Sequence, residues 1–530
     1  MDSAITSLLN SSSKTYQVSE QKFWRWSVAL IVINSLVWFL IYSYYRHGLD
    51  NADMVEAFAW GNTWDWGNNK HPPMTGWVTA LWFKIFPTND SGFYLLTEFN
   101  FGVALAFLSL AMRRVMSPVQ VFVALILTMM FSRYGFDTGY KYNANSGQLP
   151  FITGFLWACM NAIERKHRVI FWWCLSGFFA AAAVLSKYSA LLLIVAIAFG
   201  LWTVLKPNVM TALKGAAIAS IVAMILISPH VWWEIQHQWP SIHYMHQSHL
   251  IGNNSDEDQV TLDAFFGLLK FSALSLIVWI VITLKLKSVI NHQPRNRLGL
   301  VIYLAGISLT ILAAWIENIR VESTWFIVPS IFLGWALVDL TSSGINWRQV
   351  SLRAGRIFAS YLALMIVAAV VFEINYDRYP APAEYAMKQR LANDITHLYN
   401  HEYHQKIETV AGTFPLPYDL AFYSPDHPKG LYGLQLAAST WIDKKAIQHQ
   451  SKVVVCGSAG LFSSQQTTFC ENKAISLFGI PQKRTTLQYQ VYDPQHKRMK
   501  SSKFVVLMYP KPNLKRQILA KTHINTSKRS

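Results

Sequence analysis

Residues 66–77, WGNNKHPPMTGW, place a lysine and a histidine beside two prolines and between tryptophans. Proline fixes the backbone φ angle and disfavours helix at the residue before it, so this segment gives Lys70 and His71 a stiff mount. Fixed cations of this kind bind anions and stabilise the negative charge that develops on a leaving group. The segment therefore predicts a binding site for an anionic ligand.

Three more cations, Arg133, Lys141 and Lys187, lie close to the ends of long apolar runs. A charged side chain next to hydrocarbon is costly, and it usually faces a cavity, a ligand or an opposite charge. Each of these side chains could instead extend to lipid phosphates. Together with Lys70 they favour a shared anionic ligand, because one ligand would account for all four.

Three acidic residues, Asp50, Asp53 and Glu56, follow the first apolar run directly. Asp53 and Glu56 are three residues apart, which places them on one side of a helical turn. A carboxylate at this position can act as a general base or stabilise positive charge on a reacting group. The same residues are also typical of solvated loops and helix N-caps, so they are candidates for catalysis.

The elements that must position these residues are membrane spans. Of the 530 residues, 52% are hydrophobic and 14% are charged, compared with about 25% charged in an average soluble domain. A segment of about 20 apolar residues can cross the hydrocarbon layer. Eleven candidate spans run over residues 23–45, 93–112, 119–131, 149–162, 169–185, 190–205, 212–229, 265–284, 298–316, 325–340 and 358–374.

Lysine and arginine are more frequent in the loops on the side of the N-terminus, which places that side in the cytoplasm. We expect a cytoplasmic tail at residues 1–22 and a transmembrane catalytic domain at residues 23–375. Its outer-face loops are expected at residues 46–92, 132–148 and 230–263. The odd number of spans then sends residues 376–530 to the outer, periplasmic side.

Residues 376–530 contain fewer apolar residues and several strand-like segments. SKVVVCGSAG, LQYQVYD and KFVVLMY predict strands of a small α/β or α+β domain. Cys456 and Cys470 lie in this region, where an oxidising compartment would permit a disulfide bond. Cys159 and Cys174 lie in apolar spans and are interpreted as small hydrophobic residues.

The formal net charge of +17 could indicate a nucleic-acid partner. Much of that charge is scattered over short loops between spans, where topology and attraction to anionic lipids account for it. No basic stripe or nucleic-acid motif is present, so we expect a membrane protein that binds no nucleic acid.

Two patterns resemble metal sites. The acidic triplet at residues 256–258 resembles the metal-binding motif of nucleotide-sugar transferases, but it lies in an outer loop, away from nucleotide sugars. His237, His243, His246 and His249 could bind a metal, although partly buried imidazoles of an interfacial segment are the preferred interpretation. No metal ligand is assigned and no cofactor is predicted from these patterns.

An acid after the first span, followed by Gly-x-x-x-His-Pro-Pro at residues 67–73, resembles the GT-C glycosyltransferases of the protein O-mannosyltransferase and 4-amino-4-deoxy-L-arabinose lipid A transferase superfamily. Further matching segments follow in order: KYNANSGQLP, LSKYSALLL, PHVWWEIQHQWPSIHY and RVESTWFIVP. Most of the matches lie in roughly the first 250 residues. The resemblance implies a polytopic α-helical membrane protein of GT-C type, with about 11 transmembrane helices.

The resemblance also implies roles for particular residues. The essential acid of the first outer loop maps onto Asp53, while Asp50 and Glu56 remain competitors because the usual Asp-Glu pair is absent. Asparagines replace a second acid of the family, which leaves the role of that position open. The expected donor-phosphate residues are Lys70, His71, Arg133, Lys141, Lys187 and Tyr188, and the expected sugar or acceptor residues are Asn143, Asn145, Asp137, His237, Arg320 and Glu322.

The implied reaction is transfer of a sugar, with inversion, from an undecaprenyl-phosphate carrier on the outer face of the bacterial inner membrane. The expected acceptor is lipid A or a related envelope glycan. A hydroxyl acceptor would need a base, whereas a lipid phosphate is already a nucleophile. The alternatives are a transferase acting on protein hydroxyls or polysaccharide, a lipid or solute transporter, and a scaffolding membrane protein.

Overall fold

The computed structural model describes residues 2–45, 48–49, 52–136, 140–165, 167–249, 257–284, 286, 297–317, 322–341, 344–374, 384–457, 464–493 and 498–511. The chain forms two compact units. The first, the helical unit, contains residues 1–45, 70–75 and 91–371. The second, the mixed unit, contains residues 46–69, 76–90 and 372–530.

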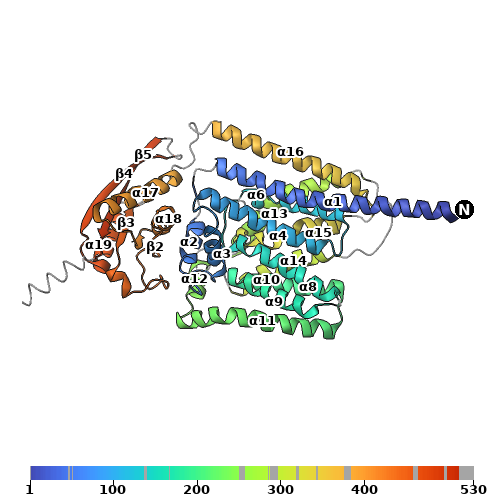
Figure 1. Cartoon of the computed structure of the whole chain (residues 1–530), viewed down its shortest axis with the longest axis horizontal. Coiled ribbons are helices and arrows are strands. Elements are labelled where there is room, and N and C mark those ends of the chain that lie inside the picture. The colour runs from blue at the N-terminus through green and yellow to red at the C-terminus, as the bar shows by residue number, and fades with distance from the viewer. Residues whose placement is uncertain are drawn as a thin grey trace, which may run out of the picture. The chain divides into compact units, whose positions relative to one another are not determined.

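The helical unit is a bundle in which α1, α11 and α16 run nearly parallel (Figure 1). Its elements are α1 (Asp2–Tyr45), α4 (Asp90–Met112), α5 (Pro118–Met129), α6 (Ser132–Phe136), α7 (Ala144–Gly147), α8 (Leu149–Glu164), α9 (Val169–Ser186), α10 (Ala190–Gly200), the π-helix η1 (Leu201–Leu205), α11 (Val209–Gln236), α12 (Pro240–His249), α13 (Glu257–Thr283), α14 (Leu298–Ile316), the 3-10 helices η2 (Ser323–Ile327) and η3 (Pro329–Phe332), α15 (Leu333–Leu340) and α16 (Trp347–Ile374).

All eleven predicted spans coincide with helices. Within the described part of the chain, eight helical segments are long and apolar enough to cross a membrane, and α5 and the α10–η1 segment are shorter apolar helices. The chain is therefore a multi-pass membrane protein. One expectation changes: residues 2–22, predicted as a polar tail, are helical and continue into the first span as α1.

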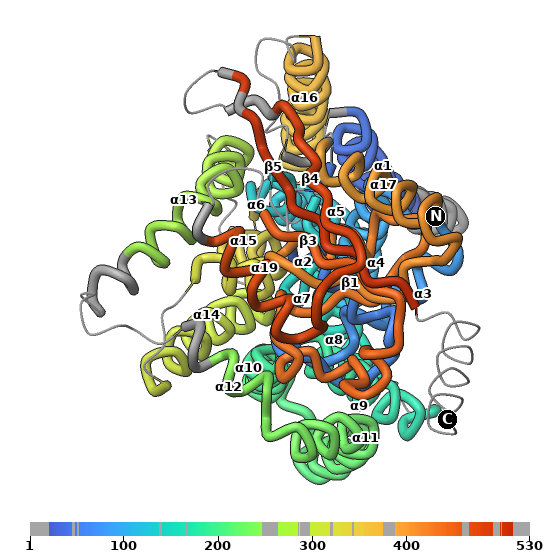
Figure 2. The backbone as a smooth tube through the Cα atoms, turned by 90° about the vertical axis from the view of Figure 1, so that its left-hand side faces the viewer, coloured from blue at the N-terminus to red at the C-terminus, as the bar shows by residue number. Residues whose placement is uncertain are grey.

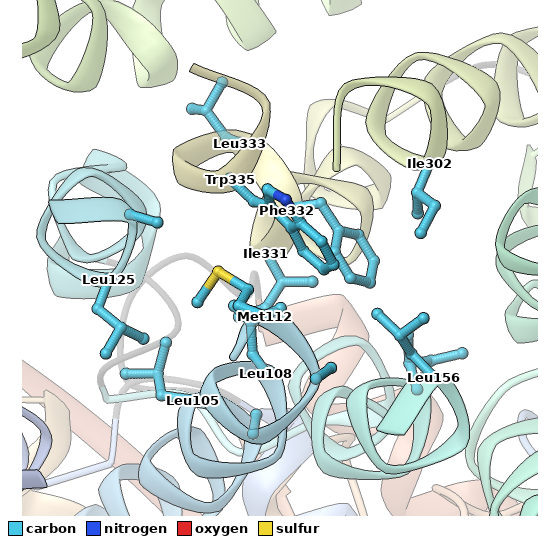
Figure 3. Close-up of a cluster of buried hydrophobic side chains, with 14 of the residues drawn as sticks. Leu105, Leu108, Met112, Leu125, Leu156, Ile302, Ile331, Phe332, Leu333 and Trp335 are labelled. Carbon is cyan, nitrogen blue, oxygen red and sulfur yellow. The ribbon is translucent and has the colours of Figure 1, made fainter. Parts of the chain in front are cut away.

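The core of the helical unit joins helices that lie far apart in the sequence. Figure 3 shows side chains of α4, α5, α8, α14, η3 and α15 meeting in one cluster. Its labelled residues are Leu105, Leu108, Met112, Leu125, Leu156, Ile302, Ile331, Phe332, Leu333 and Trp335. Trp335, the largest side chain of the cluster, is fully buried and contacts neither lipid nor water.

Helices α5 and α15 approach so closely that a side chain does not fit between them. A Cβ atom at Gly334 would overlap the backbone carbonyl of Ala124 and the backbone nitrogen of Thr128. Small residues permit this kind of contact between membrane helices, where backbone atoms pack directly. Gly334 is therefore required by packing.

We expect Gly334→Ala to lower the unfolding free energy of the detergent-solubilised protein by about 1–3 kcal/mol, because the helices must separate to admit the methyl group. Thermal unfolding measures this loss. Gly355→Ala is the control, since its Cβ atom would lie 3.9 Å from the ring of Phe122, an ordinary contact. Equal melting temperatures for the two variants would contradict the packing argument.

The mixed unit contains a five-stranded sheet and the helices around it. Its elements are α2 (Ala52–Gly61), α3 (Met74–Phe83, whose first turn lies in the helical unit), α17 (Glu384–Tyr403), β1 (Thr409–Gly412), α18 (Leu416–Tyr423), β2 (Lys429–Gly430), η4 (Ala446–His449), β3 (Lys452–Gly457), α19 (Ser464–Phe478), β4 (Lys483–Asp493) and β5 (Arg498–Tyr509). The strand order is β2-β1-β3-β5-β4. Strands β2, β1 and β3 run parallel to one another. Strand β5 is antiparallel to both of its neighbours, β3 and β4, and Figure 2 shows β4 beside β5.

The three strands predicted in this region are confirmed as β3, β4 and β5. The sequence analysis missed β1 and β2, which have four and two residues, too few to show an alternating pattern. Cys456 and Cys470 form the expected disulfide, which joins β3 to α19 with a Cα–Cα distance of 5.7 Å.

The first outer loop does not follow the expected domain boundary. Residues 46–69 and 76–90 were assigned to the transmembrane domain, but they form one compact unit with the C-terminal region. The physical reason is that the buried apolar side chains of α2 pack on α18, a contact between residues far apart in the sequence.

Candidate active site

Lys70 and His71 lie in an irregular segment before α3 and face α12. The Lys70 Nζ atom is 5.4 Å from the centre of the Tyr244 ring, and the His71 ring is 6.4 Å from the same ring. A cation at this distance from an aromatic face is stabilised by the ring quadrupole. The two residues are thus held as a pair by one tyrosine.

Lys187 follows the end of α9 and joins three distant segments. Its Nζ atom donates a hydrogen bond of 2.6 Å to Asn145 Oδ1, and it lies 5.6 Å from the centre of the Trp325 ring. Asn145 belongs to α7 and Trp325 to η2. The geometry therefore brings together three segments that lie far apart in the sequence.

The short helix α7 determines where Asn145 lies. Asn143 caps this helix, and its Oδ1 atom accepts hydrogen bonds from the backbone N–H groups of Asn145 and Ser146 at 3.0 and 3.2 Å. The Asn143 oxygen is therefore used within its own turn. The other predicted asparagine, Asn145, accepts the hydrogen bond from Lys187.

Tyr188, next to Lys187, belongs to a buried polar network. Its hydroxyl bonds to His230 Nε2 at 2.7 Å and donates to Glu234 Oε1 at 3.2 Å. Ser241 Oγ donates to the same Glu234 oxygen. His230 and Glu234 are four residues apart near the end of α11, and both are 1% exposed.

This network leaves one carboxylate oxygen available. Glu234 Oε2 is buried and has no hydrogen-bond partner within the described residues. Burial raises the pKa of Tyr188 above its usual value, and the charge of Glu234 raises it further, so the hydroxyl remains a hydrogen-bond donor at neutral pH. The network fixes the position of Tyr188 and with it the chain on either side.

Arg133 is bound to the same 3-10 helix that carries Trp325. Its Nη2 atom donates a hydrogen bond of 2.7 Å to Ser323 Oγ, and its guanidinium lies 4.0 Å from the centre of the Phe271 ring. Helix η2 therefore links Arg133 to Lys187. Lys141 lies 5.1 Å from the neighbouring Tyr140 ring.

Two further predicted residues have local contacts. His237 stacks on Trp233 with a ring separation of 4.2 Å, and its Nδ1 atom lies 2.8 Å from the Trp233 carbonyl oxygen. Glu322 precedes η2, and its backbone oxygen accepts a hydrogen bond from the Trp325 N–H at 2.9 Å. Neither contact ties the residue to the predicted cations.

The acidic candidates belong to the mixed unit. Asp53 lies in the first turn of α2 and is partly buried, and Glu56 is 1% exposed. Burial raises the pKa of Tyr418 well above its usual value, and the nearby charge of Glu56 raises it further. Asp50, Asp137, Arg320 and the side chains of His246 and His249 lie outside the described residues. No group of three or more potential metal ligands occurs among the residues described.

The sequence analysis missed His230, Glu234, Ser241, Tyr244 and Trp325. A sequence signal was available for His230 and Glu234, because residues four apart share one face of a helix. That signal depends on α11 continuing to Gln236, well past the end of the apolar stretch that defines the span. The contacts of Tyr244 with Lys70 and of Trp325 with Lys187 join residues distant in the sequence.

The fold and one sequence segment are similar to those of known proteins. ArnT from Cupriavidus metallidurans bound to undecaprenyl phosphate has a similar structure, with a TM-score of 0.54 and 13% identity over 91% of this chain and 98% of that chain. Its apo state gives a TM-score of 0.53 and 12% identity over 91% and 97%. The fold is therefore that of the ArnT-like GT-C glycosyltransferases.

Residues 70–233 match the model of the dolichyl-phosphate-mannose-protein mannosyltransferase family. The matched segment begins at Lys70 and ends just before Glu234, so it contains most of the cations described above. No match is found among curated proteins. The predicted resemblance to the ArnT and mannosyltransferase superfamily is thus confirmed.

We expect Tyr188→Phe to lower the unfolding free energy by about 1–3 kcal/mol, because His230 and Glu234 each lose a buried hydrogen-bond partner. Thermal unfolding in detergent measures the change. Tyr44→Phe is the control, since Tyr44 is 58% exposed on α1. If the two variants melted together, the buried network would contribute nothing to stability.

Proposed function

We propose that the protein is an inverting glycosyltransferase that moves a sugar from undecaprenyl phosphate to lipid A or a related envelope glycan at the periplasmic face of the inner membrane. One observation carries the proposal. Lys187, Asn145 and Trp325 meet from three segments, and Arg133 is bound to the helix that carries Trp325. This arrangement concentrates positive charge where a carrier phosphate would bind.

The reaction needs such a site because the leaving group is an anion. As the bond between sugar and phosphate breaks, negative charge grows on the phosphate and the sugar becomes positively charged. Cations fixed at the departing oxygen stabilise this transition state more than the ground state. We assign this role to Lys187, Arg133 and Lys70, with His71 and Lys141 in support.

Asp53 is the proposed catalytic acid-base residue. Toward a hydroxyl acceptor its carboxylate would accept the proton as the oxygen attacks the sugar. Toward a phosphate acceptor it would instead stabilise positive charge on the sugar or orient an amino group. Asp50 and Glu56 are the alternatives, although Glu56 is buried beside Tyr418.

An apolar cavity in the helical unit supports a lipid donor. It has a volume of about 380 Å³ and lies among α8, α9, α10 and α11. Val184 and Leu191, three residues on either side of the Lys187–Tyr188 pair, line one end, and Leu201 and Trp202 of η1 line the other. We propose that the isoprenoid chain of the carrier occupies this cavity while its phosphate lies at Lys187.

Comparison of intact lipid A from cells with and without the gene tests the function. We expect a mass increase of one sugar when the gene is present. Unchanged lipid A together with a change in glycoproteins or polysaccharide would replace the acceptor with one of the alternatives. Unchanged lipid A, glycoprotein and polysaccharide would reject the transferase function.

We expect Lys187→Met to reduce the rate of transfer about 100-fold, because it removes a fixed charge from the leaving phosphate. Asp53→Asn should give a comparable loss in kcat. The rate is measured with purified protein in proteoliposomes that contain the donor lipid. Lys214→Met is the control, because Lys214 is an exposed cation on α11. A Lys187→Met variant as active as this control would remove Lys187 from the site.

A further inference from the structure

Helix α2, which carries Asp53, is held by the C-terminal part of the chain. Its residues from Met54 to Gly61 are all buried, and the helix packs on α18. Every residue of α18 is buried as well. The helix that presents the proposed catalytic carboxylate is thus embedded in the mixed unit.

Aromatic rings form the apolar part of this contact. Phe58 of α2, Phe83 of α3 and Phe422 of α18 form a triangle with ring separations of 5.1, 5.5 and 5.6 Å, all edge to face. Edge-to-face pairs add stabilisation beyond the area they bury. Gly61 and Gly76 bring α2 and α3 into backbone contact, since a Cβ atom at Gly61 would overlap the Gly76 carbonyl.

Tyr423 contributes polar contacts between α18 and the loop that contains α2. Its hydroxyl accepts a hydrogen bond of 3.2 Å from the Leu49 backbone N–H and donates one of 2.8 Å to Asp90 Oδ1. Leu49 precedes α2, and Asp90 ends the second outer-loop segment of the mixed unit. One hydroxyl at the end of α18 therefore ties both ends of the loop that contains α2.

Helix α18 is itself fixed to α17. The buried Asp419 carboxylate pairs with the Lys388 ammonium at 3.4 Å. Burial raises the pKa of Asp419, and the positive charge of Lys388 opposes that shift. Both side chains of this ion pair are largely buried, and the pair joins α18 to α17.

We infer that Tyr423 and Phe422 are positioning residues for Asp53, and that the C-terminal region acts on catalysis through the contact of α18 with α2. This inference rests on the proposed function. The Tyr423 hydroxyl acts through the loop that carries Asp53 and does not itself reach the reacting atoms. Its loss should therefore change the chemical step more than the binding of the donor phosphate, which we assign to residues of the helical unit.

A double-mutant cycle tests the inference. We expect Tyr423→Phe and Asp90→Ala each to lower kcat about tenfold, with the KM for the donor lipid unchanged, because each variant removes the same charge-assisted hydrogen bond. The double variant should be no slower than either single variant, since the pair acts as one unit. All rates are measured per folded protein in proteoliposomes.

The chain offers a closely matched control. Tyr489 and Tyr423 are both 9% exposed, and Tyr489 donates a hydrogen bond of 2.7 Å to Asp394 in the same unit, between β4 and α17. Tyr489→Phe and Asp394→Ala should leave kcat unchanged. Phe422→Leu is a second probe that removes a ring without adding a polar group, and it should lower kcat in the same way.

Three outcomes decide the matter. A fall in kcat for Tyr423→Phe but not for Tyr489→Phe, with a non-additive cycle, supports the inference. Equal kcat values for these two variants, alongside an inactive Asp53→Asn, overturn the inference and leave the proposed function standing. A fully active Asp53→Asn variant overturns the assignment of the acid and this inference together.

Discussion

The hydrogen bond from Lys187 to Asn145 holds a full positive charge at the end of an apolar helix. Next to hydrocarbon such a charge is tolerated only when fixed partners replace water. The cap of α7 presents Asn145, η2 presents Trp325, and the Tyr188 network fixes the adjacent backbone. Much of the loop structure in the helical unit serves to hold this ammonium group in place.

Composition and periodicity predicted the parts of the fold that depend on local sequence. Each of the eleven apolar runs falls on a helical segment, and strand-like segments identified β3, β4 and β5. The rarity of charge in this chain also singled out Lys70, Arg133 and Lys187. These predictions succeed because burial in lipid or in a sheet imposes a pattern on consecutive residues.

Partners that meet across long sequence separations escaped prediction. Tyr244 reaches Lys70 from α12, and Trp325 reaches Lys187 from a 3-10 helix with no apolar period. The contact between α2 and α18 escaped prediction for a related reason. An apolar helix face has the same sequence pattern whether lipid or another helix covers it, so the sequence of α2 did not reveal that α18 packs on it.

The mixed unit combines two early segments of the chain with the C-terminal region. Residues 46–69 and 76–90 leave the ribosome early, whereas α18, their packing partner, follows more than three hundred residues later. During that interval Phe58 of α2 can pack on Phe83 of α3 but lacks its contact with Phe422 of α18. The growing chain therefore passes through an intermediate with exposed apolar surface that is prone to chaperone binding or proteolysis. A prematurely terminated chain would remain in that state.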